Sequence, residues 1–155
     1  MKRIVITSGY FNPIHKGHIE YFDRALTYGF YLYVIVNNDK QVELKGSQPF
    51  MDLEERTIIL EALKRVDFVI PSIDEDLTVC KTLEKLVESL RYTWGNDTKI
   101  IFAKGGDRNK RNIPEAKVCK KLGVEIVDGL GKKIQSSSEL LKKRAPIKIA
   151  VKFKK

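Results

Sequence analysis

The chain has 155 residues, 43% of them hydrophobic, and a formal net charge of +9 at pH 7. This length suits one domain with a substantial apolar core and excludes a disordered or collagen-like chain. No apolar run approaches the roughly 18 residues of a membrane span, so we expect no membrane association. Cys80 and Cys119 are too few for a disulfide framework. With no secretory signal recognisable, these features predict a cytoplasmic protein with reduced thiols.

Strand-like and helix-like segments alternate along most of the chain. The strands are short apolar runs rich in β-branched and aromatic residues, and the helices carry apolar side chains every three or four positions. In chain order the predicted elements are strand Arg3–Ser8, helix Gly17–Tyr28, strand Tyr31–Val36, helix Asp52–Arg65, strand Asp67–Ile70, a helix over Leu77–Leu90, strand Lys99–Ala103, helix Glu115–Leu122, strand Val124–Val127 and helix Ser136–Arg144. Such alternation predicts an α/β fold: a Rossmann-like, doubly wound, mainly five-stranded parallel sheet with helices on both faces.

The last residues of the chain follow a different pattern. From Ile147 to Lys154, apolar residues alternate with lysine or alanine, which is the period of a half-exposed strand. Such a strand could lie at an edge of the same sheet or pair with another subunit. Residues 142–155 also hold seven basic side chains and no acidic one, which accounts for +7 of the net charge. We therefore divide the chain into a domain over residues 1–144 and a basic C-terminal strand or tail over residues 145–155.

Four segments with polar or glycine-rich character follow the predicted strands. They are Ser8–His18, Asn37–Gly46, Lys104–Arg108 and Lys132–Ser138. In an open α/β sheet, ligands bind outside the carboxyl ends of the strands, where the strand order reverses. Because all four segments fall at that edge, the sequence predicts a ligand site there.

The first of these segments reads SGYFNPIHKGH. Gly9 allows a close approach of the backbone, and His15 and His18 flank Gly17 where the next helix begins. A helix N-terminus offers unpaired N–H groups and a positive dipole end, which suits a phosphate, and two imidazoles can donate hydrogen bonds to developing phosphoryl charge. Two alternatives are a helix cap without function and a zinc pair, although a third histidine is missing for the latter.

The motif from His15 to His18 matches the HxGH signature of the cytidylyltransferase-like nucleotidyltransferases. The preceding GYFNPI resembles the first loop of that family, and KIQSSS at residues 133–138 resembles its second signature, so that the likeness spans about residues 3–141. Many relatives have an acidic residue where Asn12 stands. Two signatures at opposite ends of one predicted fold make the resemblance specific.

The resemblance implies an enzyme, with residues 1–144 as its nucleotidyltransferase domain. A phosphorylated acceptor, such as a sugar or polyol phosphate, would attack the α-phosphate of ATP or CTP, and pyrophosphate would leave by direct in-line displacement. Mg²⁺ is expected with the triphosphate, without direct ligation by protein side chains. Leu44–Gly46 and Lys104–Asp107 look more like the heptose-phosphate adenylyltransferase branch than the glycerol-phosphate cytidylyltransferase branch, which favours ATP. A homodimer is a further expectation from the relatives.

The family motifs also imply roles for individual residues. His15 and His18 would stabilise the transition state, Lys45 would neutralise phosphates of the nucleotide or the acceptor, and Arg56 would face the site from the start of its helix. Glycines after the fourth strand would let backbone approach the base or ribose, and the three serines would hold phosphates while capping a helix. The residues expected to bind the nucleotide are Gly9, Tyr10, Phe11, His15, Gly17, His18, Lys104, Gly105, Gly106, Asp107, Lys133, Ser136, Ser137 and Ser138.

Two other functions remain open at the level of sequence. The net charge would suit a nucleic-acid-binding module. Because the excess charge lies in the C-terminal residues, we do not expect nucleic acid as the main partner. A nucleotide-binding scaffold without turnover is the other alternative. Nucleotide binding without pyrophosphate release would distinguish that scaffold from the enzyme.

Overall fold

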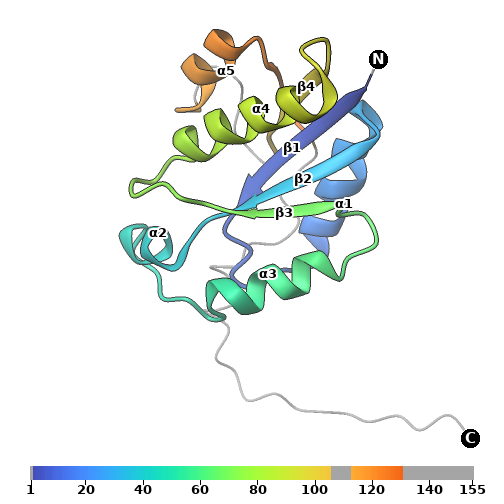
Figure 1. The fold of residues 1–155 in the computed structure, drawn as a ribbon. Coiled ribbons are helices and arrows are strands. Elements are labelled where there is room, and N and C mark those ends of the chain that lie inside the picture. Colours follow the sequence, from blue (N-terminus) through green and yellow to red (C-terminus); the bar gives the residue numbers. More distant parts are fainter. Residues whose placement is uncertain (1, 106–112, 131–155) are drawn as a thin grey trace, which may run out of the picture.

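A computed structural model describes residues 2–105 and 113–130 of the chain (Figure 1). Five parallel strands form one sheet in the order β3-β2-β1-β4-β5. The strands are β1 (Arg3–Gly9), β2 (Tyr31–Val36), β3 (Phe68–Pro71), β4 (Lys99–Ala103) and β5 (Glu125–Val127). The helices are α1 (Lys16–Ala25), the short 3-10 helix η1 (Leu26–Tyr28), α2 (Asp39–Leu44), α3 (Leu53–Glu61), α4 (Cys80–Trp94) and α5 (Ala116–Leu122).

The strand order reverses between β1 and β4. From β1 the chain moves outward through β2 to β3, and it then returns to the other side of β1 for β4 and β5. Helices α1 and α3 cover one face of the sheet, and α4 and α5 cover the other (Figure 1). The predicted five-stranded, doubly wound fold is therefore confirmed, with its switch point at the carboxyl ends of β1 and β4.

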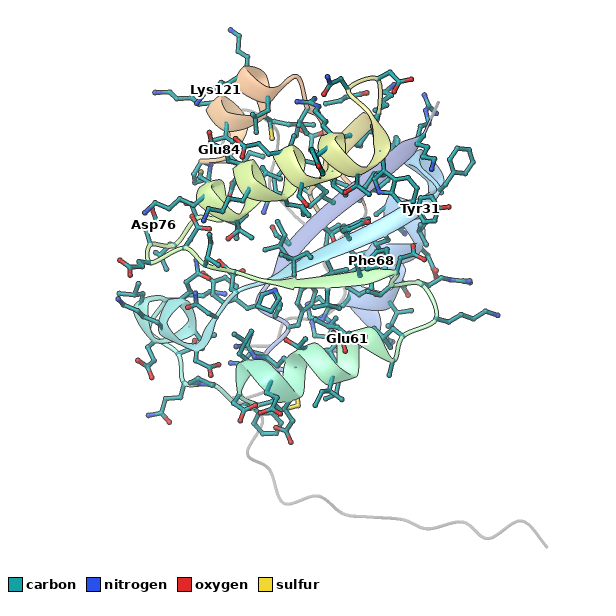
Figure 2. The ribbon with its side chains drawn as sticks, in the orientation of Figure 1. Tyr31, Glu61, Phe68, Asp76, Glu84 and Lys121 are labelled. Atoms are coloured by element: carbon teal, nitrogen blue, oxygen red, sulfur yellow. The ribbon has the colours of Figure 1, made fainter. Side chains whose placement is uncertain are left out.

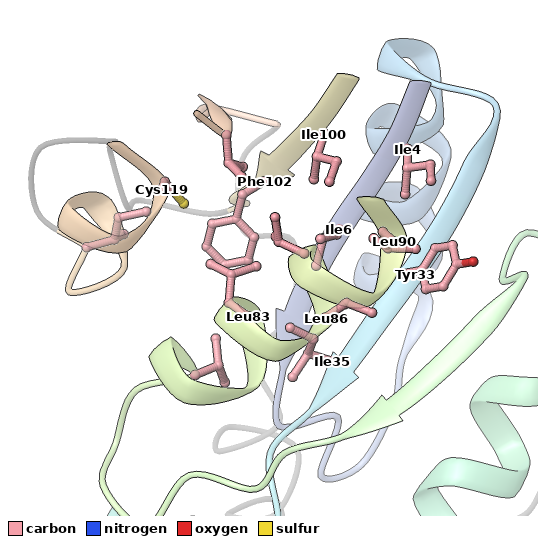
Figure 3. Close-up of a cluster of buried hydrophobic side chains, with 14 residues drawn as sticks. Ile4, Ile6, Tyr33, Ile35, Leu83, Leu86, Leu90, Ile100, Phe102 and Cys119 are labelled. Atoms are coloured by element: carbon pink, nitrogen blue, oxygen red, sulfur yellow. The ribbon is translucent and has the colours of Figure 1, made fainter. Parts of the chain in front are cut away.

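Successive side chains of the central strands point to opposite faces of the sheet and pack into two apolar cores. Ile4 and Ile6 of β1 pack beneath α4 and α5, whereas Val5 between them packs toward α1 and α3. Figure 3 shows the first of these cores, in which Leu83, Leu86 and Leu90 of α4 lie over the strands. Because each central strand is covered on both faces, it reads as a continuous apolar run.

An ion pair at the surface links α5 to α4. Glu84 and Lys121 extend from the two helices toward each other in Figure 2, and Lys121 Nζ lies 3.3 Å from Glu84 Oε1. Tyr31 and Phe68, also labelled there, mark the amino ends of β2 and β3, at the edge of the sheet away from the switch point.

The structure differs from the predicted elements at several places. Helix α3 ends at Glu61, four residues before the predicted end at Arg65. A short helix, α2, occupies part of the segment predicted as a loop after the second strand. Helix α4 begins at Cys80, because Leu77 lies in a turn where the Thr78 N–H donates to Asp76 Oδ1. The first helix gives way to η1 after Ala25. The predicted helix over 136–144 and the strand over 147–154 lie outside the described residues. Within the described part of the chain, no helix is long and apolar enough to cross a membrane.

Candidate active site

The two histidines hydrogen-bond across the first turn of α1. His15 is the N-cap residue, and its Nδ1 accepts from the Gly17 N–H at 3.1 Å. In return, the His15 main-chain N–H donates to Nδ1 of His18, also at 3.1 Å. The imidazoles stack with 3.9 Å between ring centroids. This is a capping box built from histidines, and it satisfies donors that a helix start leaves open.

These contacts determine where the imidazoles carry their protons. A ring nitrogen that accepts a hydrogen bond is unprotonated, so a neutral imidazole in this arrangement carries its hydrogen on Nε2. Burial, followed by the neighbouring His15, lowers the pKa of His18 from 6.5 to about 3. His18 is therefore a neutral hydrogen-bond donor through Nε2 at any physiological pH.

The aromatic ring of Phe11 packs against the imidazole of His18. Its ring meets the His18 imidazole edge-on at 4.8 Å between centroids and contacts Phe22 at 5.6 Å. Phe11 is 1% exposed and has a φ of 52°, an uncommon value for a non-glycine residue. Any nucleotide contact at this position would consequently come from its main chain. A Cβ at Gly9 would lie 2.8 Å from Phe11 Cζ, so the glycine makes room for this ring.

Lys45 reaches the same loop from the side of β2. It follows α2 as the C-cap residue, and its Nζ lies 4.3 Å from the centroid of the Tyr10 ring. An ammonium above an aromatic face is a cation–π contact. The structure thus brings two predicted site residues, Lys45 and Tyr10, into direct contact.

Arg56 is buried and donates four hydrogen bonds to protein partners. Its Nη1 donates to the carbonyl oxygens of Tyr10 at 2.7 Å and Asn37 at 2.6 Å, and its Nε donates to Met51 at 3.0 Å. Its Nη2 forms an ion pair with Asp39 Oδ1 at 2.6 Å, while the side chain of Arg56 is 0% exposed. Arg56 therefore holds together the ends of β1 and β2 and the start of α3. Direct contact with a substrate remains a prediction.

Asn12 is a positioning residue that the sequence did not single out for the site. The side chain is 4% exposed, its Nδ2 donates to the Gln48 carbonyl at 2.9 Å, and its Oδ1 accepts from the Phe50 N–H at 2.6 Å. Asn12 thereby fastens the loop after β1 to the segment that follows Lys45. Its departure from the acidic residue of many relatives was the one signal in the sequence.

Lys104 and Gly105 line the other side of the switch point. The Lys104 Nζ donates to Ser8 Oγ at 2.8 Å, which joins the end of β4 to the end of β1. A Cβ at Gly105 would lie 3.1 Å from the Tyr21 ring, so glycine favours this close approach of the backbone to α1. Gly17 lies in the first turn of α1, as expected.

The remaining predicted binding residues are not placed by the structure. Gly106, Asp107, Lys133 and the serines 136–138 lie outside the described residues. Among residues 2–105 and 113–130, no group of three or more His, Cys, Asp and Glu side chains is arranged to hold a metal ion. Hydrogen-bond donors and positive charge instead lie along the carboxyl ends of β2, β1 and β4. They come from Lys45, from the N-terminus of α1 and from Lys104. Such an arrangement suits the binding of phosphates.

The chain is similar to known proteins over most of its length. Residues 6–144 match the cytidylyltransferase-like family. The bifunctional protein HldE of Hahella chejuensis is 35% identical over 137 residues, and HldE of Geotalea uraniireducens is 34% identical over 136 residues. These alignments cover 87% and 86% of this chain but 24% of each relative, so the chain spans about a quarter of their length.

Solved structures show the same fold at low sequence identity. The lipopolysaccharide core biosynthesis protein from Thermoplasma volcanium superposes with a TM-score of 0.62 at 23% identity, covering 86% of this chain and 99% of that one. The bifunctional NMN adenylyltransferase/ADP ribose pyrophosphatase from Francisella tularensis has a TM-score of 0.57 at 15% identity, covering 90% and 41%. The family match over most of the sequence and the HxGH motif at the start of α1 lead to one conclusion: the chain belongs to the cytidylyltransferase-like family of nucleotidyltransferases.

Proposed function

We propose that this protein transfers a nucleoside monophosphate from a nucleoside triphosphate to a small phosphorylated acceptor and releases pyrophosphate. The observation that carries the proposal is the reciprocal hydrogen bonding of His15 and His18 at the N-terminus of α1. It prepares donors next to a helix N-terminus at the switch point of the sheet, where anionic ligands bind.

The chemistry follows from where charge develops. A phosphate oxygen of the acceptor attacks the α-phosphorus, the bond to the bridging oxygen of the β-phosphate breaks, and the electron pair leaves with pyrophosphate. Negative charge grows on the α-phosphate oxygens and on the leaving group. Nε2–H donors fixed before the reaction stabilise that charge without reorganisation. Because His18 is neutral, it contributes a hydrogen bond rather than a full positive charge.

Positive charge would come from the two lysines that flank the first loop. Lys45 is held above Tyr10 on the side of β2, and Lys104 is held against Ser8 on the side of β4. Mg²⁺ would enter as the counter-ion of the triphosphate, as part of the substrate. The protein's contribution is then positioning and charge stabilisation, with no covalent enzyme intermediate.

For the two substrates we favour ATP and a sugar phosphate. The similarity to HldE proteins supports the heptose-phosphate adenylyltransferase branch, which Leu44–Gly46 and Lys104–Asp107 also resemble. Glycerol phosphate with CTP is the principal alternative within the family.

A pyrophosphate-release screen tests the proposal. The full chain would be incubated with MgCl₂ and each pairing of ATP or CTP with sugar phosphates, glycerol phosphate, choline phosphate, ethanolamine phosphate and FMN. We expect release with one pairing, and we expect His18→Ala to abolish it. Arg24→Ala, at the exposed end of the same helix, is the matched control and should retain full turnover.

Two results would overturn the proposal. One is full turnover by His18→Ala with the responsive pairing. The other is tight binding of ATP or CTP by the wild-type protein without pyrophosphate release across the whole panel, which would instead favour a nucleotide-binding scaffold.

A further inference from the structure

Tyr21 bridges the strands where β1 and β4 separate. The paired register of these strands ends at Ile6 and Phe102. Just beyond, the Tyr21 hydroxyl donates to the Ala103 carbonyl. The loss of water around this hydroxyl raises the pKa of Tyr21, and a hydrogen bond from the Ser8 main chain works in the opposite direction. One side chain of α1 therefore fixes both strand ends.

Lys104 is held at the same place through two different strands. Its main-chain N–H donates to the Val127 carbonyl of β5 at 2.7 Å. Its Nζ crosses to Ser8 at the end of β1, passing 5.0 Å from the centroid of the Phe102 ring. A lysine side chain has a flexible four-carbon stem, so the stem by itself does not fix the direction of the ammonium group. The hydroxyl of Ser8 supplies that direction, and as a neutral acceptor it leaves the charge of the ammonium intact.

We propose that Ser8 is a positioning residue that aims the Lys104 ammonium at the triphosphate, with Tyr21 holding Ser8 in place. This inference rests on the proposed function, because it assigns the ammonium a phosphate to meet. Ser8 lies one residue before Gly9 and Lys104 one residue before Gly105, so the pair stands between the two glycine-containing loops of the switch point. Aiming the charge in advance avoids ordering a flexible side chain when nucleotide binds.

A double-mutant cycle between Ser8 and Lys104 tests the inference. ATP affinity would be measured by calorimetry with MgATP, and kcat and KM by pyrophosphate release, for Ser8→Ala, Lys104→Met and the double variant. We expect Ser8→Ala to weaken MgATP binding or lower kcat/KM by about 3- to 30-fold, the usual range for a misdirected charged group. In the Lys104→Met background the same substitution should have no further effect.

Two more variants separate positioning from simple structural support. Ser8→Thr retains the hydroxyl and should recover most of the lost affinity, whereas Tyr21→Phe should act in the same direction as Ser8→Ala. Thr27→Ala removes an exposed hydroxyl in η1, away from the switch point, and should change neither quantity. Equal losses from Ser8→Ala in both Lys104 backgrounds, or no rescue by threonine, would overturn the proposal.

Failure of this inference is distinguishable from failure of the proposed function. If the wild-type protein binds MgATP without releasing pyrophosphate, the proposed reaction is wrong, but the cycle in binding affinity still reports on Ser8. If turnover is observed and Ser8 and Lys104 act independently, the reaction stands and the positioning role is wrong. Thermal unfolding of every variant checks that the fold persists.

Discussion

The Phe11 ring meets the His18 imidazole edge-on, with 4.8 Å between their centroids. This contact shields one side of the imidazole from water, and the stacked His15 ring covers another part of it. Burial is the main reason that the pKa of His18 falls to about 3. The native protein therefore excludes a proton that the unfolded chain binds below its ordinary pKa of 6.5.

This difference predicts how stability depends on pH. Between pH 6.5 and about 3 the unfolded state binds more protons than the native state, so stability falls as the pH is lowered. From pH 7 to pH 5, His18 alone should account for a loss of about 2 kcal/mol. His18→Gln should remove that portion of the pH dependence. Urea unfolding of both proteins at pH 7 and pH 5 provides the measurement, and parallel losses in the two proteins would contradict the assignment.

Arg56 and Arg65 provide a matched comparison of buried and exposed arginine. Arg56→Met should destabilise the protein by about 3–5 kcal/mol, because Asp39 and three main-chain carbonyls lose a buried donor. Arg65 pairs with Asp23 at 2.5 Å, but these side chains are 51% and 45% exposed, so Arg65→Met should cost about 0–1 kcal/mol. Equilibrium unfolding in urea compares the two. Similar losses would mean that Arg56 does not hold the loops together.

Gly9→Ala should reduce turnover through the position of Phe11. The added Cβ would lie 2.8 Å from Phe11 Cζ, so the ring must shift, and with it the surface on which His18 rests. We expect kcat/KM to fall by about tenfold or more, since a small displacement of catalytic groups is costly. Gly129→Ala is the control: its φ of +68° makes alanine strained, yet a Cβ there has no neighbour within 4 Å among the residues that the structure describes. A larger loss of turnover in the control would contradict this explanation.

Much of the fold follows from signals that are local in the sequence. Apolar runs such as Tyr31–Val36 predict buried strands correctly, and their alternation with helices predicts the sheet and its switch point. Helix α2 was not predicted because DKQVEL has little apolar periodicity. The helix is stabilised by the Asn38 cap, whose Oδ1 accepts from the Gln41 N–H, and by the buried Gln41 side chain. The start of α4 depends on Asp74, which accepts from the main chain of Lys81 and Thr82 across a turn.

Only those parts of the candidate site that lie within a short sequence motif could be predicted. His15, Gly17 and His18 could be located because one short motif holds them all, and the structure places them at a helix start as expected. The surroundings of Arg56 could not be foreseen, because its four partners come from three segments that lie apart in the sequence. The contact between Ser8 and Lys104 could not be foreseen for the same reason, since the two residues are 96 positions apart.

Removal of divalent metal should stop turnover without unfolding the protein. Mg²⁺ would arrive with the triphosphate, and no described group of three acidic, histidine or cysteine side chains is arranged to retain it. We therefore expect EDTA to abolish pyrophosphate release and MgCl₂ to restore it, while the melting temperature of the nucleotide-free protein stays constant. A large drop in that melting temperature with EDTA would instead indicate a structural metal.

Asn12→Asp should destabilise the protein at neutral pH and recover when the pH is lowered. The substitution keeps an oxygen for the Phe50 N–H, but it replaces the Nδ2 donor to the Gln48 carbonyl with a second carboxylate oxygen. At pH 7 the repulsion and the unpaired carbonyl should cost about 1–3 kcal/mol.

Burial and the facing carbonyl would raise the pKa of the new carboxyl group above its value in the unfolded chain. A protonated carboxyl group can donate to Gln48, so the deficit relative to wild type should be smallest below the unfolded pKa and should grow as the pH rises. Urea unfolding at pH 4 and pH 7 measures this difference. Asn96→Asp in the exposed turn after α4 is the control and should show little change at either pH. A deficit for Asn12→Asp that is the same at both pH values would show that the Gln48 contact does not help to fasten the loop after β1.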